Sequence, residues 1–250
     1  MTGPVKRALV TGGSDGLGAS IVRWLVSQDY DVVVLDIEKP GFAEKPVEFV
    51  RCDLSDRTHL EDILPKLVEA GPYDLVVLNA GINATGRFEA IETDLHLDVM
   101  RINLEAPMII SARLLAAGAF TPKAAMVLVS SLSLFIGYPG AASYAASKDA
   151  LAVYAKSMRK IALAKHVSIT VAFPGPLRTS HAERHSPEGA NAEKRMDPDI
   201  AAGLIMADTL AGRRQSIPGF GNRLSALAGR LFPRSVTAVM RRVIYQRLKP

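Results

Sequence analysis

Three polar side chains have the types and spacing needed to move a proton to or from a reacting oxygen. Tyr144 and Lys148 are four residues apart, so on a helix they share one face. A lysine ammonium beside a phenol favours the phenolate and lowers the pKa of the phenol toward working pH. Ser131 carries a further hydroxyl thirteen residues before Tyr144, and a hydroxyl beside the proton-transfer residue would bind the same oxygen. The pattern indicates a general acid/base with an oxyanion-binding partner.

A glycine-rich turn near the start of the chain predicts a phosphate-binding site. The sequence Thr11-Gly12-Gly13-Ser14-Asp15-Gly16-Leu17-Gly18 follows an apolar run and precedes an amphipathic helical pattern. Glycines let the backbone approach a pyrophosphate closely, and the helix N-terminus offers free N–H groups. The Gly-x3-Gly-x-Gly spacing differs from the more familiar Gly-x-Gly-x2-Gly, and an ordinary glycine-rich turn is the alternative. The candidate cofactor contacts here are Gly12, Ser14, Asp15, Gly16, Leu17 and Gly18.

Acidic residues near this turn favour NAD over NADP. Asp36 ends the second apolar run, eighteen residues beyond Gly18, where a carboxylate can accept hydrogen bonds from ribose hydroxyls and repel a 2′-phosphate. Asp15 would oppose the same phosphate. Asp53, followed by Leu54, is placed to meet the adenine amino group. The alternative is that Asp36 caps a helix or turn, and that Asp53 is a helix N-cap.

The apolar pattern predicts one α/β domain with a doubly wound parallel sheet of about seven strands and helices on both faces. Its strand candidates are nearly continuous apolar runs, which is typical of strands covered on both faces, and segments of helical spacing separate them. We expect this unit to span residues 1–212 and a basic amphipathic segment to span 213–250. The polar stretch Thr179–Asp199 is predicted to be a mobile loop. The six strands identified are Arg7–Thr11, Val32–Asp36, Val47–Cys52, Leu75–Asn79, Met126–Ser130 and Ile169–Phe173.

From about residue 5 to 180 the chain resembles the short-chain dehydrogenase/reductase family. The shared marks, in order, are Thr11-Gly12-x3-Gly16-x-Gly18, Asn79-Ala80-Gly81, Asn103, Ser131, Tyr144-x3-Lys148 and Pro174-Gly175. The resemblance implies an NAD(H)-dependent oxidoreductase that interconverts a secondary alcohol and a ketone, working as a homodimer or homotetramer. A glycine-rich ending with Asp-Gly-Gly, which often packs such relatives into tetramers, is absent from this sequence.

The resemblance also implies a role for each matching residue. Tyr144 would be the general acid in reduction and the general base in oxidation, and Ser131 would polarise the substrate oxygen. Lys148 would lower the pKa of Tyr144 and hold the nicotinamide ribose. Asn103, in a helix expected over Leu95–Leu115, would hold a water that relays protons, although a buried structural amide is the alternative. The remaining implied cofactor contacts are Asn79, Ala80, Gly81, Pro174, Gly175, Leu177 and Thr179.

Composition limits the other classes of function. The net charge of +5 comes from residues 213–250, which carry nine Lys/Arg and no Asp or Glu. The main body is therefore slightly acidic, which argues against a nucleic-acid partner. The five histidines have no ligand-like spacing, so no metal is expected. A single cysteine, no long apolar run and no secretory pattern predict a cytoplasmic protein.

Two questions stay open at this level. Leu224, Leu227, Ala228 and Leu231 form one apolar stripe, and Val236, Val239, Met240, Val243 and Ile244 form another, each flanked by arginines. Both stripes either pack on the domain or across a dimer, or lie on an anionic membrane through 220–250. The substrate is a small alcohol or ketone, with Leu132 and Tyr138 as further candidate contacts. The competing function is a cofactor-binding regulatory module with little turnover.

Overall fold

A seven-stranded parallel sheet forms the centre of the protein. The computed structural model describes residues 5–41, 47–184, 192–243 and 245. The strand order is β3-β2-β1-β4-β5-β6-β7, so the order reverses between β1 and β4. Ligands of open parallel sheets bind at such a switch point, outside the carboxyl ends of the strands. The strands are β1 (Arg7–Thr11), β2 (Asp31–Asp36), β3 (Glu48–Arg51), β4 (Tyr73–Leu78), β5 (Phe120–Val129), β6 (Ser168–Ala172) and β7 (Gln215–Ser216).

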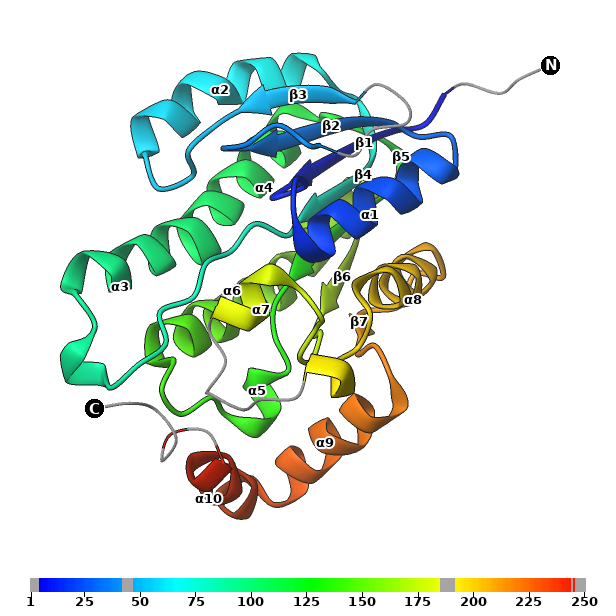
Figure 1. Cartoon of the computed structure of the whole chain (residues 1–250). Coiled ribbons are helices and arrows are strands. Elements are labelled where there is room, and N and C mark those ends of the chain that lie inside the picture. The colour runs from blue at the N-terminus through cyan, green and yellow to red at the C-terminus, as the bar shows by residue number, and fades with distance from the viewer. Residues whose placement is uncertain (1–4, 42–46, 185–191, 244, 246–250) are drawn as a thin grey trace.

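Helices cover both faces of the sheet, which makes a three-layered domain (Figure 1). Strand residues alternate between two apolar clusters: Leu9 faces α2, α4 and α6, whereas Ala8 and Val10 face α1 and α8. This explains the continuous apolar runs, because each strand is buried on both sides. The helices are α1 (Gly16–Ser27), α2 (Arg57–Glu69), α3 (Thr93–Met100), α4 (Ala106–Ala117), α5 (Ser133–Ile136), α6 (Ala142–Ala164), α7 (Ser180–Arg184), α8 (Pro198–Leu210), α9 (Phe220–Leu231) and α10 (Pro233–Val243).

The predicted doubly wound parallel fold is confirmed, with differences at element boundaries. β5 begins at Phe120, six residues before the predicted start, because its first residues form an irregular extension opposite Tyr73. The helix predicted over Leu95–Leu115 consists of α3 and α4, joined by a π-helical turn at Arg101–Glu105. β7 has only two residues, which is too short for any periodicity. It nevertheless pairs with β6 and carries the sheet beyond residue 212.

The stretch Thr179–Asp199 is not a continuous loop over its described parts. It contains α7, a 3₁₀ turn at Ala192–Lys194 and the first residues of α8. Met196 forms an isolated bridge with Leu177, so the chain returns close to the segment that follows β6. The predicted mobility of 185–191 lies outside the described residues.

Candidate active site

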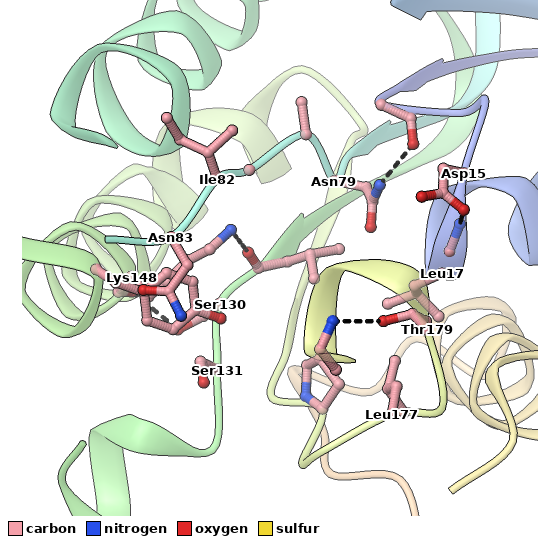
Figure 2. A pocket seen from close by; sticks show the side chains of 18 of the residues that line it. Asp15, Leu17, Asn79, Ile82, Asn83, Ser130, Ser131, Lys148, Leu177 and Thr179 are labelled. Atoms are coloured by element: carbon pink, nitrogen blue, oxygen red, sulfur yellow. Dashed lines mark hydrogen bonds between the residues drawn. The ribbon is translucent and has the colours of Figure 1, made fainter. Parts of the chain in front are cut away.

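A cavity of about 1060 Å³ lies at the carboxyl ends of the strands. Its two ends are distinct in Figure 2: Asp15, Leu17 and Asn79 lie at one, and Ser130, Ser131 and Lys148 at the other. The first end is built by the loops after β1 and β4, and the second by the loop after β5 and by α6. The topology therefore places the glycine turn and the polar triad on one continuous cavity.

The glycine turn has the geometry of a close-approach loop. Gly12 and Gly16 adopt left-handed φ angles of +64° and +55°, which favour glycine. A Cβ on Gly18 would lie 1.8 Å from the Gly12 carbonyl oxygen, so this glycine lets α1 pack against the end of β1. Gly18 does not line the cavity and serves the packing instead. The Asn79 amide donates to the Gly12 and Thr11 carbonyls, at 3.0 and 3.2 Å, and holds the turn in place.

Four carboxylates line the glycine-turn end of the cavity: those of Asp15, Asp36, Glu38 and Asp53. The Asp36 carboxylate accepts the backbone N–H groups of Ser14 at 2.9 Å and of Ile37 at 2.7 Å, which ties β2 to the glycine turn. Asp36 is thus both a turn anchor and a wall of the cavity. Among residues 12–54 the charged side chains that line this end are these four carboxylates, whereas Arg184, Lys194 and Arg195 line the cavity from the segment after β6.

Two of these carboxylates also have local partners. Asp15 is the N-cap of α1, because its side chain accepts the Gly16 N–H. Asp53 accepts the hydroxyl and the backbone N–H of Ser55, at 2.7 and 2.8 Å, and these bonds hold the pKa of Asp53 below its ordinary value. The N-cap of α2 is Asp56, not Asp53. The N-cap alternative for Asp53 is therefore wrong, whereas the turn alternative for Asp36 is right, because Asp36 accepts the N–H groups of Ser14 and Ile37.

Tyr144 and Ser131 meet at the other end of the cavity. Both line it, and the Ser131 side chain lowers the pKa of Tyr144. The Tyr138 ring stands perpendicular to that of Tyr144, with centroids 6.0 Å apart, and forms a further wall. Burial raises the pKa of Tyr144, while the Ser131 side chain opposes the rise. The lowering expected from Lys148 is not found: Lys148 is not among the groups that shift this pKa, and desolvation of the phenolate outweighs the effect of Ser131.

Lys148 lies one helical turn below Tyr144 on α6 and is almost fully buried. Its exposed fraction is 4%, and its ammonium donates to the Val129 carbonyl at 2.9 Å. Burial lowers the pKa of Lys148 from 10.5 to about 8. The neighbouring Ser130 hydroxyl donates to the Lys148 carbonyl at 2.8 Å and fixes α6 against the end of β5. A cation is thus held beside the cavity at neutral pH.

Asn103 supports this end without lining the cavity. Its side-chain oxygen accepts the Ile82 N–H at 2.8 Å. Its amide donates to the Ile82 carbonyl at 2.9 Å and to the Ser147 hydroxyl at 3.0 Å. Both amide N–H groups are therefore occupied within the protein, as in the structural alternative considered from the sequence. The proton-relay role of Asn103 stays a prediction.

The structure brings nearly all the predicted site residues to this one cavity. Gly18 and Asn103 are the two that do not line it. Sequence reasoning did not place Ser130 or Ser133 at the site, yet both line the cavity. It also missed Met240 and Val243, which reach the cavity from α10. No sequence signal could have found these two, because nothing local shows that α10 folds back over the loop after β5.

The cavity suits a dinucleotide. It is long, it begins at the N-terminus of α1, and glycines form that end. Asn83 lines the cavity and is 5% exposed. Its buried side-chain oxygen has no hydrogen-bond partner among the described residues. A buried acceptor without a donor indicates that a bound molecule or water supplies one. The described residues contain no cluster of metal-ligand side chains.

Comparison with known proteins identifies the family. The model of the short chain dehydrogenase family matches residues 6–189. The chain belongs to this family. A cyclic-di-GMP-binding biofilm dispersal mediator protein of Escherichia coli is 31% identical over 181 residues, 70% of this chain and 74% of that protein. The 3-oxoacyl-acyl-carrier-protein reductase of the same organism is 25% identical over 231 residues, 89% of each chain.

Solved structures of short-chain dehydrogenases share the fold. One from Streptomyces avermitilis has a TM-score of 0.79 at 20% identity and covers 97% of this chain and 98% of its own. One from Sphingobium yanoikuyae, in complex with NADPH, has a TM-score of 0.74 at 19% identity, over 91% of this chain and 94% of its own. A 4-hydroxyisoleucine dehydrogenase complexed with NADH has a TM-score of 0.74 at 21% identity, over 86% and 98%. The protein is thus an oxidoreductase of the short-chain type, and its neighbours include binders of each nicotinamide cofactor.

Proposed function

We propose that this protein is an NAD(H)-dependent oxidoreductase that interconverts a secondary alcohol and a ketone. The observation that carries the proposal is the pair of Tyr144 and Ser131 on the cavity wall, with the buried Lys148 lining the same cavity. Two hydroxyls that converge on one oxygen form an oxyanion site with its own proton source. The cofactor, when bound, supplies or accepts the hydride.

The protein's residues would divide the remaining work. In reduction, the Ser131 hydroxyl donates a hydrogen bond to the substrate carbonyl oxygen, and Tyr144 transfers its proton to that oxygen as negative charge develops there. In oxidation the Tyr144 phenolate takes the proton from the alcohol. Because burial raises the pKa of Tyr144, the phenol keeps its proton at neutral pH, which favours the reductive direction under those conditions. Lys148 would hold the ribose hydroxyls of the cofactor.

The preference for NAD over NADP rests on charge. The carboxylates of Asp15, Asp36 and Glu38 line the cavity where an adenosine ribose would lie against β2. A 2′-phosphate there would meet like charges in a partly buried site, whereas a 2′-hydroxyl can donate to them. The acidic pair Asp15 and Asp36 was the basis of the prediction from sequence, and the structure adds Glu38 to the same wall.

A panel of ketones and secondary alcohols with NADH, NADPH and their oxidised forms tests the proposal. We expect turnover at 340 nm with at least one carbonyl/alcohol pair, and a higher kcat/KM with NADH than with NADPH. The competing function, a cofactor-binding regulatory module, predicts that NADH binds while every substrate fails. Faster turnover with NADPH would contradict the charge argument and leave the reaction class intact.

A further inference from the structure

The last two helices leave an unusual amount of apolar surface exposed. We call residues 220–243, which comprise α9 and α10, the C-terminal hairpin. Within it Phe220 is 82% exposed, and Leu231 and Phe232 are each 63% exposed. These exposed fractions are higher than those of apolar side chains that lie at the edge of a hydrophobic core and are partly covered by it. The large apolar residues of the hairpin with exposed side chains are Phe220, Leu224, Leu227, Leu231, Phe232, Val239 and Val243.

The packing of α9 is the reason for this exposure. The helix rests on α5 through its small residues Ala226 and Gly229, which are buried. A Cβ on Gly229 would lie 2.0 Å from the Phe135 carbonyl oxygen, so the contact depends on a glycine. Leu224, Leu227 and Leu231 therefore point away from the domain. The apolar stripe seen in the sequence is an outward face and does not cover the core.

The charged side chains of the C-terminal hairpin are all positive. Residues 213–250 hold nine Lys/Arg and no Asp or Glu, and five of the arginines lie within the hairpin. Arg230 stacks over the Phe135 ring, 4.6 Å from its centroid, and Arg223 donates to the Ile217 carbonyl at 3.0 Å. Arg234 and Arg242 are exposed. An apolar stripe flanked by arginines fits a surface that is apolar inside and anionic outside.

A second copy of the chain is a poorer occupant of this face. A two-fold interface sets a patch against itself, so the arginines of one hairpin would face those of the other. Residues 213–250 contain no acidic side chain to neutralise them. An anionic lipid surface supplies both the negative charge and the apolar interior. No helix in the described ranges has the length and apolarity to cross a bilayer, which leaves a helix lying in the interface.

We propose that the C-terminal hairpin docks the protein on an anionic lipid bilayer. The leucine stripe and the two phenylalanines enter the acyl region, and the arginines contact the headgroups. The hairpin also borders the cavity: Met240 and Val243 line it from α10, and Asn222 of α9 abuts Gly175 after β6. The exposed apolar face and this part of the cavity wall thus both belong to the C-terminal hairpin, which lies at the end of the molecule opposite α2 and β3 (Figure 1). This arrangement suits an apolar substrate that enters from the membrane.

Co-sedimentation of the full chain with vesicles tests the proposal. We expect binding to phosphatidylcholine vesicles that contain phosphatidylglycerol, weak binding to phosphatidylcholine alone, and release at high salt. Leu224→Ser/Leu231→Ser should weaken binding roughly 100-fold, since each leucine loses its transfer into an apolar phase. Each arginine near an anionic surface contributes about fivefold to binding. Arg234→Glu/Arg242→Glu removes two, so it should weaken vesicle binding by about 25-fold or more.

A matched double variant on another face provides the control. Ile200 and Leu210 of α8 are 60% and 57% exposed, close to the 57% and 63% of Leu224 and Leu231. Ile200→Ser/Leu210→Ser should bind vesicles like the wild type. Equal binding by the hairpin variant, or no binding by the wild type at low salt, overturns the proposal. A dimer in light scattering that only the hairpin variant abolishes also overturns it, because the face is then an interface between copies. Turnover of a soluble ketone without vesicles is measured in parallel, so failure of docking is distinguishable from failure of the proposed reaction.

Discussion

Replacing Lys148 by Met should stabilise the fold of the cofactor-free protein while it damages the site. The ammonium is 4% exposed, and its surroundings lower the pKa of Lys148 from 10.5 to about 8 through burial. That difference corresponds to about 3 kcal/mol, by which the folded state disfavours the charged amine. The variant also loses the hydrogen bond to the Val129 carbonyl, which lowers its stability by about 1 kcal/mol. Methionine has a similar length and no charge, so we expect a net gain of about 2 kcal/mol at pH 7.

The pH dependence of this gain follows from proton binding in the two states. Below about pH 8 the amine is charged in both the folded and the unfolded chain, so the wild type bears the full cost. Between about 8 and 10.5 the unfolded chain binds the additional proton, so wild-type stability rises relative to the variant. Above that range both amines are neutral and the advantage of the variant disappears. The stability gained by the Lys148→Met variant is therefore largest at neutral pH and is lost as the pH rises through the range from about 8 to 10.5.

Denaturant unfolding at several pH values measures the difference directly. Lys160→Met, which removes an exposed lysine from the same helix, is the matched control and should change stability by less than about 0.5 kcal/mol. In a thermal scan at pH 7 the Lys148 variant should melt roughly 4–8 °C above the wild type. A variant that is less stable than the wild type at pH 7, or whose difference does not shrink above pH 8, would refute the reasoning.

Other outcomes follow from the same structure. Burial raises the pKa of Tyr144, so kcat/KM for alcohol oxidation, which needs the phenolate, should increase continuously from pH 7 to 10; a plateau below pH 8 in this profile would contradict it. Asp36→Asn keeps an acceptor oxygen but removes the charge, and should reduce the preference for NADH over NADPH roughly tenfold or more in kcat/KM; an unchanged ratio would show that Asp36 does not set the preference. Gly229→Ala should lower the free energy of unfolding by about 1–3 kcal/mol, because its Cβ collides with the Phe135 carbonyl. Gly221→Ala, at an open position of the same helix, should be neutral or stabilising, and equal effects of the two in chemical denaturation would argue against this packing.

The sheet could be predicted from the sequence because its strands are buried on both faces. Runs such as Val32-Val33-Val34-Leu35 are typical of parallel sheets, and β2 contains that run. The two-residue β7 could not be found in this way, because it has no pattern of its own and is placed only by pairing with β6. The break between α3 and α4 was missed as well, since a π-helical turn changes the periodicity by only one residue.

The candidate site could be predicted wherever its residues follow strands directly. Ser131 comes just after β5, and Asp36 ends β2, so parallel topology alone brings them to one edge. The helix faces were harder to assign. The sequence left open whether the leucine stripe of α9 packs on the domain or across a dimer, or lies on a membrane, and the structure shows that a glycine–carbonyl contact of the opposite face turns it outward. The direction of the Tyr144 pKa shift was also beyond sequence reasoning, because it depends on how deeply the phenol is buried.

The comparison of Tyr144→Phe with Tyr154→Phe tests the central claim most directly. Both tyrosines lie on α6, but the Tyr154 hydroxyl bonds with Ser111 outside the cavity, at 3.1 Å. Turnover at 340 nm with the best substrate is measured together with NADH binding by fluorescence. We predict that Tyr144→Phe lowers kcat by about 10²–10⁴-fold with NADH binding retained, and that Tyr154→Phe keeps near wild-type kcat. A Tyr144→Phe enzyme that turns over at the wild-type rate would contradict the account.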